Sequence, residues 1–341
     1  MTLEMAEAQK ASAKMWVPIL AKYREPLVGR SLFELAITLG AFLGVWALAW
    51  FAMSISPWLA LPIALLNGVW LVRVFLIQHD CGHQSLFRSR HANDWVGRIA
   101  GVLTLTPYDV WRRTHSIHHA HAGNLDRRGI GDVMTLTVEE YRSRSWFGRL
   151  KYRLYRNPVV MFGLGPAYLF LLDYRLPLGL MKSGWRYWAS SMGTNLMLIA
   201  LLSVLYYFGS WQVLVFIYLP TVLSAATIGV WLFFVQHQFE ETYWGHEPDW
   251  QMHDAALMGS SHYKLPQPLR WLTANIGIHH VHHLYSRVPF YRLSEILRDY
   301  PTLAEAQVLT LRESLACARL HLWDERAKKL VSFRDAGLAA A

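Results

Sequence analysis

Four stretches of the chain are long, apolar and almost free of charged residues. The hydrocarbon core of a bilayer is about 30 Å thick, so a helix needs about 20 apolar residues to cross it. Each stretch reaches that length, and a short polar break separates the two members of each pair. We therefore predict an all-α membrane protein whose four transmembrane helices form two hairpins, at about residues 33–53, 57–77, 187–208 and 211–236.

The basic residues predict how these helices are oriented. Of 33 Lys and Arg, only Arg73 lies inside a predicted span. The tail 1–32, the segment 78–186 and the chain after residue 236 hold 5, 16 and 11 of the others, and the hairpin turns hold none. Cytoplasmic loops are enriched in Lys and Arg, so we expect both termini and the polar segments 78–186 and 237–341 in the cytoplasm. Arg73 either snorkels to the headgroups or pairs with a buried acid.

The composition alone, 53% apolar over 341 residues, would also suit one large soluble domain, and the length of the apolar runs decides against it. The net charge of +9 is then a topological signal that also holds anionic headgroups, and we expect no nucleic-acid partner. No linker or repeat divides residues 1–341, which we expect to form one domain. Residues 95–111 and 158–181 are apolar but interrupted, which predicts interfacial or half-buried helices.

Histidines are concentrated in four short groups just beyond apolar stretches. Side chains spaced i, i+3 and i+4 on a helix lie on one face, and neutral imidazole is the commonest metal ligand. Nine imidazoles exceed what one ion can use, so the pattern predicts two metals, held by a cytoplasmic helical cap. The predicted ligands are His79 and His83; His115, His118 and His119; His237; and His279, His282 and His283.

The other seven histidines are expected to be ordinary polar residues, because a lone histidine is more often a structural side chain than a ligand. His280 follows His279 by about 100° around a helix and cannot share its face. The remaining six are scattered singly along the chain: His91, His121, His246, His253, His262 and His321.

The ligand type limits the chemistry. Calcium and magnesium prefer oxygen ligands, whereas imidazole suits iron, zinc, copper or nickel. A zinc hydrolase needs three protein ligands, an open position and a carboxylate base, and a metal transporter places its ligands at the bilayer midplane. Two redox metals at the end of an apolar helical shell instead indicate oxygen activation beside an apolar substrate, with iron and dioxygen favoured.

The histidine motifs resemble those of the membrane-bound fatty acid desaturases, and in particular the bacterial acyl-lipid delta-12 (omega-6) enzymes. The resemblance covers roughly residues 33–300. Its supporting stretches are Gln78-His-Asp-Cys-Gly-His-Gln84, Gly123-Asn-Leu-Asp-Arg-Arg-Gly-Ile-Gly131, Trp231-Leu-Phe-Phe-Val-Gln-His-Gln-Phe-Glu240 and Asn275-Ile-Gly-Ile-His-His-Val-His-His-Leu284. The resemblance implies two iron ions, dioxygen as co-substrate, a membrane acyl substrate and a bacterial inner-membrane location.

By the same resemblance, the three histidine boxes and His237 are the ligands, and an external ferredoxin or cytochrome b5 delivers electrons. Phe233 stands where animal acyl-CoA relatives have an asparagine that contributes through water. Asp80 and Asn275 are candidates for contacts behind the ligands, and Asp126 and Asp132 are either orienting groups or solvated loop acids. Trp111-Arg112-Arg113 is a candidate for headgroup or donor contact, or for anchoring at the membrane surface.

Three functions remain open from the sequence. The first is desaturation of a lipid-linked acyl chain, with oleoyl to linoleoyl conversion favoured. The second uses the same site to insert oxygen, as a hydroxylase or ketolase acting on an alkane, acyl or carotenoid substrate. The third is a zinc membrane hydrolase or a non-catalytic metal-binding membrane protein, which metal analysis would distinguish from the other two.

Overall fold

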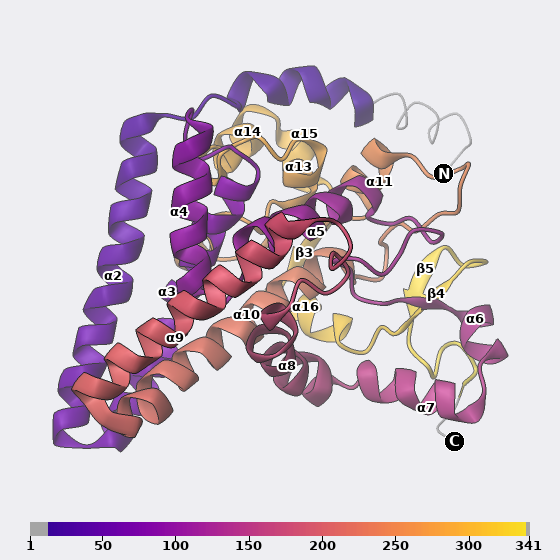
Figure 1. The fold of residues 1–341 in the computed structure, drawn as a ribbon. Helices are drawn as coiled ribbons and strands as arrows, with labels where there is room; N and C mark the ends of the chain where they lie inside the picture. The colour runs from indigo at the N-terminus through magenta and orange to yellow at the C-terminus, as the bar shows by residue number, and fades with distance from the viewer. Residues whose placement is uncertain (1–12, 339–341) are drawn as a thin grey trace.

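The computed structural model describes residues 13–338 and is mostly helical (Figure 1). The longer helices are α2 (Val28–Ile55), α3 (Pro57–Gly82), α4 (Arg90–Leu103), α5 (Tyr108–His121), α7 (Trp146–Tyr155), α9 (Trp185–Val213) and α10 (Leu219–His237). The shorter ones are α6 (Val138–Ser143), α8 (Gly165–Leu171), α11 (Met252–Met258), α12 (Gln267–Leu272), α13 (His279–Leu284), α14 (Leu293–Asp299), α15 (Pro301–Glu305) and α16 (Leu311–Cys317). Single turns and π-helical segments are η1 (Ala21–Tyr23), η2 (Val160–Leu164), η3 (Asp173–Arg175), η4 (Leu214–Tyr218) and η5 (Phe290–Arg292).

In the part of the chain that the structure describes, five short strands correct the expectation of an all-α fold. They are β1 (Leu136–Thr137), β2 (His262–Lys264), β3 (Val308–Thr310), β4 (Leu322–Asp324) and β5 (Lys329–Val331). β4 lies between β1, which is parallel to it, and β5, which is antiparallel, and β2 pairs with β3 in parallel. Strands of two or three residues are too short for an alternating pattern to show in the sequence.

Within residues 13–338, three helical stretches are long and apolar enough to cross a membrane: Val28–Ile55, Pro57–Gly82 and Trp185–His237. The third is 53 residues long and runs through α9, η4 and α10. It is broken at Ser210, whose φ of 57° is not helical, and Figure 1 shows α9 and α10 running back along each other. The break coincides with the turn predicted at residues 209–210.

Local sequence explains both turns. Between α2 and α3, the Ser56 side chain accepts a hydrogen bond from the Trp58 amide, and Pro57 occupies the first helical position. At the second turn, a Cβ on Gly209 would lie 2.1 Å from the Val213 side chain, so only glycine fits there.

Helices α3 and α10 pack closely and run in the same direction. A Cβ on Gly68 would lie 2.6 Å from that of Ser224, and the Thr221 hydroxyl donates to the Ala64 carbonyl at 3.0 Å. Small and hydroxyl-bearing residues allow such close approach between apolar helices. The two helices therefore end side by side, which brings His79 and His237 into one region.

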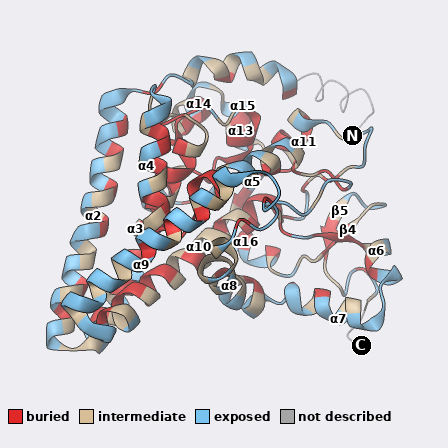
Figure 2. Cartoon of the chain, in the orientation of Figure 1, coloured by how far each residue is buried: buried red, intermediate tan, exposed pale blue. Residues whose placement is uncertain are grey.

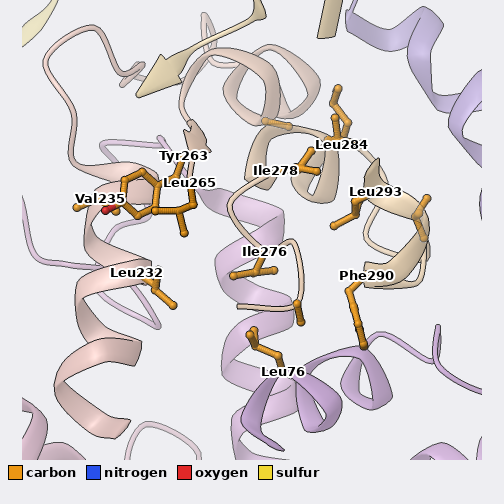
Figure 3. Close-up of a cluster of buried hydrophobic side chains, with 14 of the residues drawn as sticks. Leu76, Leu232, Val235, Tyr263, Leu265, Ile276, Ile278, Leu284, Phe290 and Leu293 are labelled. Carbon is orange, nitrogen blue, oxygen red and sulfur yellow. The ribbon is translucent and has the colours of Figure 1, made fainter. Parts of the chain in front are cut away.

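The main core lies beside these helix ends. Figure 3 shows apolar side chains from α3, α10 and the segment around α13 pointing toward one another, among them Leu76, Leu232 and Ile276. Figure 2 shows that α13 is buried, whereas α2 and α9 are exposed over much of their surface. The third histidine box therefore lies inside the protein, while the long outer helices present apolar side chains outward.

The remaining helix expectations can be compared with the structure directly. α4 is half-buried, as predicted for residues 95–111, with Ala100 buried and Ile99 63% exposed. Residues 158–181 form η2, α8 and η3. Arg73 is fully buried and pairs with Glu34 of α2, which decides against snorkelling.

Candidate metal centre

All nine predicted ligands converge at the ends of four helices, α3, α5, α10 and α13. Their nitrogens form two groups, and within each group all ligand atoms lie within 4.8 Å of one another. The first group, called group one below, holds His79, His83, His115, His119 and His282; the second, called group two, holds His118, His237, His279 and His283. Every member of group two is buried, whereas His83, His115 and His119 of group one are partly exposed.

The helical period decides which group each histidine joins. On α5, His115 and His119 are about 40° apart and share group one, whereas His118 lies about 60° to the other side and joins group two. On α13 the assignment is the opposite one. His279 and His283, spaced i and i+4, belong to group two, and His282 belongs to group one. The sequence predicted that each box faces one way, and the structure corrects this, because one turn of helix contributes to both groups.

The imidazole nitrogens are arranged as ligands around a common centre would be. The Nε2 atoms of His119 and His115 lie 3.1 Å apart, and His237 Nε2 lies 3.1 Å from that of His118 and 3.0 Å from that of His279. In addition, the Nε2 atoms of His83 and His283 are buried with no hydrogen-bond partner in the described part of the chain. Because a buried polar atom without a partner is costly, these convergent donors fit a bound cation.

In three of the imidazole rings, a neighbouring group contacts the Nδ1 atom and orients the ring. A partner at Nδ1 fixes the ring and leaves Nε2 free to bind a metal. The partners are the Asp80 carboxylate for His79 at 3.3 Å, the Asp132 carboxylate for His118, and the Gly259 carbonyl for His237 at 3.2 Å. Asp80 also accepts a hydrogen bond from the Phe290 amide at 2.8 Å.

Electrostatics keep six of the nine rings in the form that binds metals. Burial, reinforced by the neighbouring imidazoles, lowers the pKa well below its usual value for His83, His115, His119, His279, His282 and His283. The rings are therefore neutral near pH 7, and neutral imidazole is the ligand form.

An apolar cavity of about 680 Å³ ends at the histidines. His79, His115 and His279 line one part of it, and apolar residues of α3, α8 and α10 line most of the rest. Phe233 lines the cavity with its ring 5.2 Å from that of His237. A cavity of this size and lining suits an apolar ligand.

Other candidate residues lie elsewhere. The Asn275 side chain donates to the Phe290 carbonyl and accepts from Ser294, so it shapes the loop before α13. Asp126 contacts His246 at 2.6 Å at the surface. His280 is outside both groups, and its Nε2 lies 2.8 Å from the Leu303 carbonyl.

The structure corrects the interpretation of Trp111-Arg112-Arg113 as a surface contact for Trp111, whereas Arg113 is exposed and a surface contact stays a prediction for it. Trp111 is buried, and its ring stacks on that of His115 with centroids 4.6 Å apart. Arg112 pairs with Asp94 at 2.9 Å. The signal for this packing was present in the sequence, because Trp111 precedes His115 by four residues on one helix.

These features define a class: a helical, membrane-associated protein with a buried histidine centre compatible with metal binding, beside an apolar cavity. The fatty acid desaturase family model matches residues 56–314, and the chain belongs to this family of oxidoreductases. The resemblance inferred from the histidine motifs is thus confirmed.

Individual relatives cover most of the chain. A "Fatty acid desaturase" of Bacillus subtilis (strain 168) is 42% identical over 97% of this chain and 92% of its own length. In Synechocystis, an "sn-1 acyl-lipid omega-3 desaturase (ferredoxin)" is 29% identical over 79% of this chain and 74% of its own. An "sn-1 oleoyl-lipid 12-desaturase" of the same organism is 27% identical over 84% of this chain and 75% of its own length.

Proposed function

We propose that the nine histidines bind two iron ions, five in group one and four in group two, and that the centre desaturates membrane-linked acyl chains with dioxygen. The observation that carries this proposal is the pair of all-imidazole groups at the end of an apolar cavity of about 680 Å³. Bound iron would supply the oxidant, which acid–base side chains lack, for removing hydrogen from an unactivated methylene.

In the proposed reaction, two adjacent methylenes lose two hydrogen atoms and become a carbon–carbon double bond. Dioxygen takes up these hydrogens, two electrons and two protons, and leaves as two waters. The chain itself contributes position. The cavity walls hold the acyl chain, the buried histidines exclude bulk water, and Asp80 and Asp132 keep their imidazoles oriented.

The substrate we propose is an acyl chain esterified to a membrane lipid. Leu164 of η2 and Tyr168 of α8 line the cavity and are 66% and 56% exposed, so an apolar wall borders the outer surface there. An acyl chain could enter sideways from the bilayer past this wall. The names of the two Synechocystis relatives, both acyl-lipid enzymes, support the same class.

The proposed topology has four membrane-spanning helices, with α9 and α10 crossing separately on either side of Ser210. Both termini and the centre lie on the cytoplasmic side of a bacterial inner membrane, because the Lys and Arg outside the spans are all on that side. Cysteines at positions Ser56 and Ser210 should react with an impermeant thiol reagent from outside, and cysteines at Ser89 or Ser286 should not. The opposite labelling pattern would contradict this topology.

Electrons would come from a separate carrier of the ferredoxin or cytochrome b5 type. The word ferredoxin in the name of the Synechocystis omega-3 relative supports the first of these. Reduced ferredoxin with dioxygen should sustain turnover by the purified protein, and iron chelation or removal of oxygen should stop it.

For the position of the double bond, we propose delta-12 (omega-6), so that oleoyl chains gain a second double bond. The match to the Synechocystis 12-desaturase supports this position. The test is to express the chain in a host that contains saturated and oleoyl lipids and to locate new double bonds by mass spectrometry. A new double bond in a saturated chain would support desaturase activity but contradict the delta-12 position. A hydroxy acid as main product would favour the oxygen-insertion alternative.

A further inference from the structure

A buried arginine joins two apolar helices to the segment that carries the third histidine box. Arg73 of α3 is fully buried, and Glu34 of α2 is 1% exposed. The Arg73 guanidinium donates to three partners: Thr38 Oγ1 of α2 at 3.1 Å, the Glu34 carboxylate, and the backbone carbonyl of Trp271 at the end of α12. It also lies 4.3 Å from the centre of the Trp271 ring.

The contacts of Trp271 lead directly to the metal centre. Seven residues separate it from His279, and hydrogen bonds hold this link in place: Ala274 N donates to the Trp271 carbonyl, and Ile278 N to that of Asn275. The first turn of α13 then continues with His282 N donating to the Ile278 carbonyl. The position of Trp271 therefore helps to set where α13 presents its imidazoles.

A second path runs through Phe290. The Arg73 guanidinium lies 5.5 Å from the Phe290 ring, whose backbone amide donates to Asp80, the neighbour of His79. The Phe290 carbonyl accepts from Asn275, within the link to His279. Arg73 thus contacts elements that support both the first and the third box.

Stability alone is a weak reason for this arrangement. Apolar side chains of similar volume often stabilise a buried site as well as an ion pair does. They could not, however, donate to a carbonyl group of a separate segment. The planar guanidinium can donate in several directions at once, which a lysine ammonium on a flexible stem does not reproduce.

We propose that Arg73 is a positioning residue for the third histidine box, acting through Trp271. This inference rests on the proposed function only in that the histidines bind metal. Group two takes two of its four histidines from α13, whereas group one takes one of five. Loosening α13 should therefore weaken metal binding in group two more than in group one.

The test compares Arg73→Met with the wild type and with Arg30→Met. Arg30 is the other partner of Glu34 and is 48% exposed, so its loss removes the same kind of side chain without touching Trp271. Each purified full-length protein is loaded with iron(II) or zinc, and release to a chelator is followed over time. For Arg73→Met we expect one of the two ions to leave about 10–100-fold faster, the usual range for losing support behind a ligand.

Turnover gives the second readout. Arg73→Met should lower kcat about tenfold or more and change KM for the lipid by less than about twofold, because Arg73 does not itself line the cavity. Arg73→Lys keeps the charge and should restore metal retention only in part. Arg30→Met should match the wild type in both measurements.

Wild-type metal release and kcat in a membrane-inserted Arg73→Met protein would overturn the proposal. If Arg73→Met does not accumulate, Arg73→Lys is measured instead. Metal release from Arg73→Lys at the wild-type rate would also overturn the proposal. Failure of the proposed function would show separately, as a wild-type protein that forms no unsaturated product. The chelator comparison would still be valid then, since it requires only a bound divalent ion.

Discussion

Asp132→Asn tests whether a carboxylate behind a histidine sustains the metal centre. Asp132 contacts Nδ1 of His118, and the two side chains are 8% and 1% exposed. A hydrogen bond to a charged group contributes about 1.5–3 kcal/mol. At about 1.4 kcal/mol for each factor of ten, the substitution should weaken metal binding in group two by roughly 10–150-fold, close to the 10–100-fold typical of such changes.

The same loop provides a matched control. Asp126 is 42% exposed and contacts His246, which belongs to neither group. Asp126→Asn should therefore leave metal binding unchanged. The assay measures iron per chain after equilibration with a series of chelator concentrations, together with unsaturated product formed per minute. Equal iron retention in Asp132→Asn and the wild type, or equal losses in both variants, would refute the assigned role of Asp132.

Three further outcomes are expected. Gly229 lines the cavity with open space around its Cβ position, so Gly229→Phe should lower kcat/KM for long acyl chains about tenfold while iron content stays unchanged. Burial lowers the pKa of His321 to about 4. Because the unfolded chain takes up this proton near pH 6.5, the free energy of unfolding should decrease as the pH is lowered from 6.5 to 4, and His321→Asn should make that decrease smaller. His237→Ala should lose about one iron per chain, whereas His280→Ala should keep both and lose about 1–3 kcal/mol of stability with its buried hydrogen bond to Leu303.

Much of the helical architecture was predictable because it depends on long, uninterrupted features. An apolar run of about 20 residues is a strong signal, and the breaks at Ser56 and Ser210 were visible as polar interruptions. The short strands were not predictable: β1, β2 and β3 depend on partners distant in sequence, as Leu136 depends on Leu322, and β4 and β5 are too short for an alternating pattern to show. The fate of Arg73 was also left open, because the sequence does not show that Glu34 of α2 faces it.

The clustered histidines were easier to predict than their surroundings. Histidine spacing within one turn of helix is local information and indicated eight members of the two groups, whereas His237 was predicted from its position at the end of the last apolar stretch. The carbonyl of Gly259 behind His237 could not be foreseen, because any residue offers a carbonyl and only the fold selects this one. Asp132 and Asp126 lie in the same loop and looked equivalent in sequence; only the loop's path separates a buried partner of His118 from a surface partner of His246.

The unequal division of the nine histidines between the two groups follows from one property of the α-helix. Residues at i and i+4 are about 40° apart, whereas a residue at i+3 lies about 60° to the other side. Each i, i+4 pair therefore stays within one group, and each i+3 histidine joins the other. The first box has only a pair, so the boxes alone place five histidines in group one and three in group two. His237, at the end of α10, brings group two to four. The close packing of α3 and α10 at Gly68 and Ser224 thus has a consequence at the centre, because it sets where this ninth imidazole lies.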